Sequence, residues 1–178
     1  NICFADYQEV ILNLHGVLTF VSCKKDEETT TDPQPEEYVA NDESFKNFST
    51  WTLGAEHFGA DPSLGTAHAG NDSTVTRAIY FKDDAKPVNG KYPVGTVVVK
   101  HSYNEDGTVA MFAAMVKRGN NFDADNGDWE YFMLKPNGDI AVNEAGMAMR
   151  GDGPSMMGGM CLSCHTGASS KDYIFTNR

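Results

Sequence analysis

The middle of the chain consists of largely apolar runs with β-strand character, separated by polar turn segments. Four runs are rich in β-branched and aromatic residues: "STVTRAIYF" (73–81), "GTVVVKHSY" (95–103), "TVAMFAAMVK" (108–117) and "WEYFML" (129–134). The segments between them include Asn-Gly and Asp-Gly pairs, which favour tight hairpin turns. A shorter apolar run, "IAV" (140–142), follows one of these turns. The pattern predicts a curved antiparallel sheet of about four to five strands.

Helices are predicted on either side of these strands in the sequence. Phe45, Phe48 and Trp51 recur at a spacing of three, which places them on one face of a helix. A second, short helix is predicted around residues 161–165, near the C-terminus. The predicted fold class is therefore α+β and predominantly β, with a helix at each end of the folded domain.

The first 43 residues differ in composition from the rest. Residues 9–22 are apolar and end on Cys23, and residues 24–43 are rich in Asp, Glu, Thr and Pro. The apolar run is too short to span a bilayer, and an apolar run that ends in Val-Ser-Cys resembles a bacterial lipoprotein export signal with Cys23 as the lipidated residue. The alternative is a buried amphipathic helix with an ordinary core cysteine. We predict an export signal over 1–23, a flexible acidic tether over 24–43 and one folded domain over 44–178.

Length and charge limit the classes of partner. The chain has 178 residues, 40% of them hydrophobic, which is enough for one domain with its own core. Its formal net charge is −11, from 25 acidic and 14 basic residues. Nucleic acids and anionic membranes bind basic surfaces, so neither is an expected partner, and contact with a membrane is expected only through a lipid on Cys23.

The segment Cys161-Leu162-Ser163-Cys164-His165 carries the most specific chemistry. Residues three apart lie on one side of a helical turn, so both thiols can form thioethers with the two vinyl groups of one porphyrin. The adjacent His165 can then supply an imidazole to the iron. A thiol redox pair would need a βαβ context and a zinc site would need further ligands, and the sequence indicates neither. We therefore predict a c-type cytochrome with one haem c, attached through Cys161 and Cys164, with His165 as the proximal iron ligand on a short haem-binding helix.

The sixth coordination position of the iron is less constrained by the sequence. A cytochrome that only carries electrons usually has a second strong ligand, often methionine. Met156, Met157 and Met160 precede the motif, and Met111 and Met115 lie in a predicted strand. Methionine near haem is more often a packing residue than a ligand. We favour an open distal position, with a methionine-ligated electron carrier as an alternative.

Three segments, taken in order, resemble the cytochrome P-460 family, which includes cytochrome c′-beta. They are "YPVGTVVVKHS", "MVKRGNNFDADNGDWEYFMLKPNGD" and "CLSCHTGASSKDYIFT", and the similarity extends over about residues 74–176. The resemblance implies a mostly β cytochrome, often a homodimer, with a five-coordinate c-type haem.

The two branches of this family differ at positions that match Lys100 and Ala113. In the P-460 branch the matching lysine is covalently linked to the porphyrin edge, and a distal carboxylate assists the oxidation of hydroxylamine. In the c′-beta branch the link is absent, and an apolar pocket capped by phenylalanine binds nitric oxide or related gases. Counting back from Val116-Lys117 places Ala113 at the carboxylate position, and residues 108–116 contain no Asp or Glu. Candidates for the distal pocket are Phe81, Met111, Phe112, Ala113 and Met115.

These observations predict a periplasmic or surface-tethered haem protein that binds nitric oxide or another small nitrogen-oxide or diatomic ligand, with electron transfer to a redox partner protein as an accompaniment. The first alternative is a hydroxylamine-oxidising enzyme with a Lys100–haem cross-link. The second is a simple electron carrier with methionine as the sixth ligand.

Overall fold

The computed structural model describes residues 36–59 and 74–178. The predicted export signal with Cys23, and residues 24–35 of the predicted tether, lie outside the described residues. In the part of the chain that the structure describes, no helix is both long and apolar enough to cross a bilayer.

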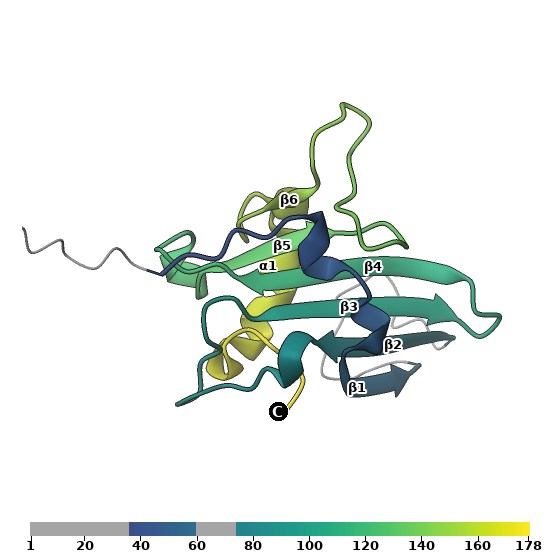
Figure 1. Ribbon diagram of the computed structural model, residues 1–178, viewed down its shortest axis with the longest axis horizontal. Coiled ribbons are helices and arrows are strands. Elements are labelled where there is room, and N and C mark those ends of the chain that lie inside the picture. The colour runs from purple at the N-terminus through teal and green to yellow at the C-terminus, as the bar shows by residue number, and fades with distance from the viewer. Residues whose placement is uncertain (1–35, 60–73) are drawn as a thin grey trace, which may run out of the picture. The chain divides into compact units, whose positions relative to one another are not determined.

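The core of the fold is a six-stranded antiparallel sheet whose strands follow one another in sequence order (Figure 1). The strands are β1 (Thr52–Phe58), β2 (Val75–Phe81), β3 (Val97–Asn104), β4 (Val109–Lys117), β5 (Trp129–Met133) and β6 (Arg150–Gly151). The helices are α1 (Met160–His165) and the short 3₁₀ turns η1 (Asp42–Phe45), η2 (Phe48–Thr50), η4 (Lys82–Asp84), η5 (Ala124–Asn126), η6 (Met156–Gly159) and η7 (Thr166–Lys171). The predicted class, α+β and mainly β, is confirmed, and so is the short C-terminal helix.

Three details of the predicted elements are wrong. The N-terminal helix is replaced by η1 and η2, because Asn47 between them adopts a left-handed conformation with φ of 56°. Strand β1 was not predicted, since most of its residues are exposed and it shows no regular alternation. Residues 140–142 form only isolated bridges, Leu134 to Ile140 and Val142 to Ala148.

The sheet has two differently covered faces. Since side chains alternate along a strand, the even-numbered residues of β4 and β5 point to one face and the odd-numbered residues to the other. The first face carries Val97, Val99, Phe112 and Phe132, which pack against Phe45 and Phe48 of the N-terminal turns. The second carries Val98, Met115, Trp129 and Tyr131, which pack with Met156, Ile174 and Cys161 from the C-terminal part. In Figure 1 the N-terminal segment crosses one side of the sheet and α1 lies on the other.

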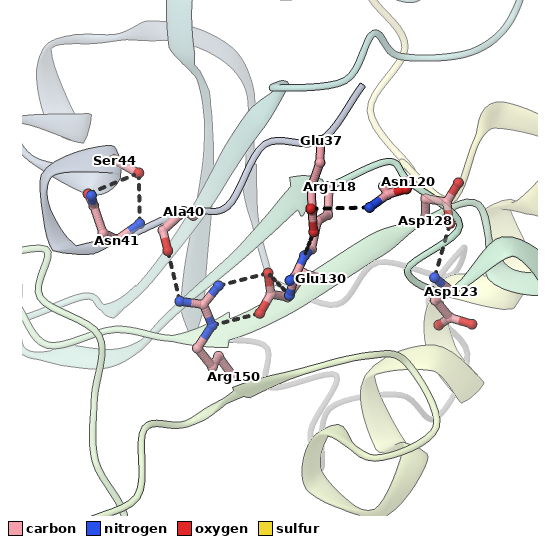
Figure 2. Close-up of polar contacts among 10 residues, drawn as sticks. All are labelled: Glu37, Ala40, Asn41, Ser44, Arg118, Asn120, Asp123, Asp128, Glu130 and Arg150. Carbon is pink, nitrogen blue, oxygen red and sulfur yellow. Dashed lines mark hydrogen bonds and ion pairs between the residues drawn. The ribbon is translucent and has the colours of Figure 1, made fainter. Parts of the chain in front are cut away.

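Residues 36–43, expected as the end of the tether, lie against the first face. Ala40 is 1% exposed, and its carbonyl oxygen accepts a hydrogen bond of 2.8 Å from Arg150. The Glu37 carboxylate binds Arg118 at 2.9 Å. Both arginines also reach Glu130, a buried carboxylate on β5 that binds Arg150 at 2.6 and 2.9 Å and Arg118 at 3.4 Å (Figure 2). This network fastens the N-terminal segment to β6, to β5 and to Arg118, the residue directly after β4.

Candidate functional site

A cavity of about 420 Å³ lies between the second face of the sheet and the C-terminal part of the chain. Strands β2 to β5 contribute Ile79, Val98, Lys100, Met115 and Tyr131 to its lining. On the opposite side, α1 contributes Cys161, Cys164 and His165, and the segment after η7 contributes Ile174–Asn177. The C-x-x-C-H segment and Lys100, which are far apart in sequence, therefore line the same space.

Helix α1 presents both cysteine side chains to the cavity. Gly158 and Gly159, with φ of 65° and 82°, turn the backbone sharply just before the helix begins, a conformation that glycine adopts without steric cost. Cys161 and Cys164 are partly buried free thiols, and burial raises the pKa of each. The described strand pairs are all antiparallel, so this part of the chain lacks the parallel βαβ unit expected around a thioredoxin-like pair.

His165 has one ring nitrogen engaged and one remaining. Nδ1 lies 2.7 Å from the carbonyl oxygen of Tyr173, and a carbonyl can only accept a hydrogen bond, so Nδ1 carries the proton and donates it. Burial lowers the pKa of His165 to about 4, which keeps the ring neutral near pH 7. A neutral imidazole whose other nitrogen donates to a backbone carbonyl is the usual state of a metal-binding histidine.

Lys100 extends from the middle of β3 into the cavity lining. Its neighbours across the sheet are Ile79 on β2 and Ala113 on β4. Burial lowers the pKa of Lys100 to about 8. A lysine in such surroundings has a larger neutral, nucleophilic fraction near pH 7 than an exposed lysine.

The five distal-pocket candidates separate into two groups. Ala113 and Met115 line the cavity. Phe112 lies on the other face of the sheet, where its ring stacks on His101 at a centroid distance of 4.4 Å. Phe81 is fully buried and stacks on Tyr92, and neither it nor Met111 lines the cavity. The strand period explains the result for Phe112, since Ala113 and Met115, which line the cavity, lie at odd-numbered separations from it on β4 and therefore point to the opposite face.

The methionines near the motif are not part of the cavity lining. Met156 is buried in the core cluster of the second face, and Met157 and Met160 are 44% and 58% exposed. Among the described residues, Met115 is the methionine that lines the cavity.

Sequence reasoning missed Tyr131, Arg77 and His57, which also line the cavity. Tyr131 is 2% exposed, and its hydroxyl has no hydrogen-bond partner among the described residues. Arg77 is buried on β2, and His57 is its neighbour across the sheet, on β1. A buried hydroxyl without a protein partner calls for an explanation, such as a bound water, ion or other group. No local sequence signal distinguishes these residues from ordinary strand residues.

The comparison with protein families gives the cavity its context. The model of the family described as Cytochrome P-460 matches residues 55–176, which include β2 to β6, α1 and nearly all of the described cavity lining. The chain belongs to the cytochrome P-460 family. No curated protein and no solved structure matched it. Members of the cytochrome P-460 family are haem c proteins with one haem iron, so this chain is a c-type haem protein.

The residues of the cavity fit this cofactor. Cys161 and Cys164 would hold the porphyrin through thioethers, and His165 would supply the neutral imidazole. The surrounding wall of Ile79, Val98 and Met115 is apolar, as a porphyrin plane requires. The unpartnered Tyr131 hydroxyl is in the same lining. When bound, haem c supplies an iron that binds small ligands and exchanges electrons.

Proposed function

We propose that this cytochrome P-460 protein carries haem c on Cys161 and Cys164, with His165 as the proximal ligand, and binds nitric oxide or another small uncharged ligand at an open distal position. The observation that carries the proposal is the absence of a carboxylate from the described cavity lining. Ala113 presents a methyl group where hydroxylamine oxidation would need a proton acceptor, and Ile79, Val98 and Met115 are its apolar neighbours in the cavity. This apolar part of the lining accepts an uncharged diatomic molecule and contains no carboxylate that could take up a proton.

The oxidation of hydroxylamine is the second candidate function, and Lys100 is the observation that favours it. The lysine lines the cavity together with both thiols, and burial lowers its pKa to about 8. A neutral amine has a lone pair available for bonding to a porphyrin edge, whereas an ammonium group does not; the link itself would also require a two-electron oxidant to remove the ring hydrogen. The missing carboxylate is the reason for ranking this function second.

Optical spectra of the ferrous protein, with and without carbon monoxide or nitric oxide, test the ranking. Gas binding predicts an ordinary c-type ferrous spectrum of high-spin iron that changes when either gas is added. The mass of the haem peptide should correspond to two thioethers, and Lys100→Met should leave both the mass and the spectrum unchanged. A low-spin spectrum that is inert to carbon monoxide would overturn the proposal in favour of an electron carrier, with Met115 as the first residue to replace.

A third covalent link has a distinct signature. It would appear as a haem peptide joined to the β3 peptide, together with a red-shifted ferrous spectrum, and both would be lost in Lys100→Met. If the wild-type protein also oxidises hydroxylamine and the Lys100→Met variant does not, the second function replaces the first.

The cellular location belongs to the same proposal. We infer that the haem is attached outside the cytoplasm, because the predicted signal over residues 1–23 would export the chain. Fractionation of cells that produce the full chain, followed by haem staining, measures this directly. Haem-bearing protein confined to the cytoplasm would contradict it.

A further inference from the structure

We propose that the buried ion pair between Lys117 and Asp172 positions the proximal histidine. The pair fixes the turn that contains Tyr173, and the carbonyl of Tyr173 in turn orients the His165 ring. This inference rests on the proposed role of His165 as the iron ligand. Lys117 and Asp172 are therefore positioning residues, without contact to the iron.

Asp172 is bound by three separate parts of the fold. Its carboxylate accepts hydrogen bonds from Lys117 Nζ on β4 at 2.7 and 2.8 Å and from the Tyr92 backbone N–H at 2.7 Å. Its carbonyl oxygen accepts one from the Trp129 indole on β5 at 2.9 Å. Lys117 is 7% exposed and Asp172 is 6% exposed, so water competes little for these contacts. Asp172 is thus anchored to the sheet as well as to the C-terminal turn.

The backbone at this point adopts a conformation that the surroundings have to maintain. Asp172 and Tyr173 are consecutive non-glycine residues with φ of 53° and 66°, in the left-handed region that side chains disfavour. The Tyr173 N–H donates to the Ala168 carbonyl at 2.9 Å, and its hydroxyl donates to the Asp125 carbonyl at 3.2 Å. Gly127 leaves room for the Tyr173 ring, since a Cβ there would lie 2.9 Å from it. Two consecutive left-handed residues persist where packing and hydrogen bonds hold them.

The turn directs the Tyr173 carbonyl at His165. The carbonyl oxygen lies 2.7 Å from Nδ1, and the Tyr131 and Phe175 rings each lie at a centroid distance of 5.6 Å from the imidazole in edge-on orientation. The hydrogen bond leaves Nε2 as the nitrogen that can bind iron. A strong Nδ1–H···O=C bond also increases the electron donation of the ring, because it gives the imidazole partial anionic character.

A buried ion pair could instead serve only stability. In that case its loss would destabilise the domain without changing the electronic properties of the haem. Glu130 offers a matched control, since it is also a buried carboxylate, bound by Arg150 and Arg118, but its side chain lies on the first face of the sheet. Glu130→Gln should lower stability while the bond between iron and His165 stays as in the wild type.

The test is resonance Raman spectroscopy of the ferrous holoprotein, combined with the midpoint potential of the haem. Three variants weaken the contacts that hold Asp172 to the sheet. Asp172→Asn and Lys117→Met each remove one charge of the ion pair, and Trp129→Phe deletes the hydrogen bond to the Asp172 carbonyl. Each should shift the iron–histidine stretching band to lower frequency and raise the midpoint potential, because a less firmly held carbonyl accepts a weaker bond from Nδ1. Glu130→Gln should shift neither.

The outcomes separate the two levels of the proposal. If the ferrous wild-type protein shows no iron–histidine band, the proposed five-coordinate iron with His165 as its proximal ligand is wrong. If the band is present and the variants leave both it and the potential unchanged, the positioning inference is wrong and the role of His165 stands. Should the two charge variants fail to fold, Trp129→Phe alone decides, since an unshifted band in that variant overturns the inference.

Discussion

Lys100 on β3 and Ala113 on β4 are direct partners across the antiparallel sheet, and both line the cavity that also contains the Cys161 and Cys164 thiols. One strand thus brings a buried amine to the proposed haem, and its neighbour brings only a methyl group. These are the two positions at which the branches of the family are expected to differ. Their pairing makes the choice between gas binding and catalysis testable by single substitutions.

Ala113→Glu should introduce hydroxylamine oxidation. The new carboxylate would enter the cavity next to Lys100 and could accept the protons that leave as hydroxylamine loses electrons. General-base catalysis is worth roughly 10²- to 10⁴-fold, and we expect about the lower limit, because the nearby ammonium form of Lys100 lowers the basicity of a carboxylate. The measurement is hydroxylamine-dependent reduction of an electron acceptor by the wild type and the variant.

Ala113→Gln is the control, since it has the same size but cannot accept a proton at neutral pH. Equal activity of the Gln and Glu variants would show that size, and not basicity, matters at this position.

His101→Phe should reduce the loss of stability at acid pH. The His101 ring stacks on Phe112, its Nε2 is buried without a hydrogen-bond partner among the described residues, and burial lowers its pKa. Below the ordinary histidine pKa of about 6.5, the unfolded chain therefore takes up a proton before the folded protein does, and the free energy of unfolding falls as the pH falls. Urea unfolding at pH 7 and pH 5 should show a smaller decrease for the variant. Parallel decreases in the two proteins would refute this role of His101.

Glu130→Gln should destabilise the domain by about 2 kcal/mol, the range for hydrogen bonds to charged groups. The substitution removes the charge that holds Arg150 and Arg118 beside the N-terminal segment (Figure 2). Lys46→Met breaks a more exposed ion pair, with Asp139, and it should change the free energy of unfolding much less. Urea unfolding of both variants provides the comparison, and similar values would contradict a central role for Glu130.

Gly119→Ala tests the contact between the N-terminal segment and the sheet. Gly119 has φ of 77°, and a Cβ there would lie 2.5 Å from the Glu36 carbonyl oxygen. Gly107 has nearly the same φ, 80°, with nothing within 4 Å, so Gly107→Ala measures the conformational cost alone, about 1–2 kcal/mol. We expect Gly119→Ala to be the more destabilising of the two and to make residues 36–41 more sensitive to protease. Equal effects of the two substitutions would mean that the close approach of the Glu36 carbonyl to residue 119 does not contribute to stability.

The sequence predicted the strands that are covered on both faces. β2 to β5 are rich in β-branched and aromatic residues because a core cluster packs on each face of the sheet, whereas β1 has mostly exposed residues and contains Gly54, so it lacks the signal. The spacing of Phe45 and Phe48 correctly indicated residues of the core but not their conformation. Asn47, which takes a left-handed conformation readily, divides the segment into two short turns.

The haem motif was recognisable because its chemistry depends on local spacing, whereas the residues around it depend on tertiary packing. Lys117 and Asp172 are separated by 55 positions, and neither segment alone indicates that they form a buried pair. Phe112 was misplaced because the sequence does not tell which face of β4 meets the cofactor. The orphaned hydroxyl of Tyr131 becomes visible only when its neighbours are known.

Helix α1 follows the six described strands of the sheet, and this order bears on how the protein matures. The N-terminal part of a chain is synthesised first, and under the proposed export it would also cross the membrane first, so the described strands would be available for pairing before the two thiols appear. An enzyme that attaches a porphyrin to an open C-x-x-C-H segment would need to displace only the residues from about 156 onward, and no strand pair would have to separate. Cofactor insertion can therefore be the closing step of assembly, with the C-terminal segment folding over a finished sheet.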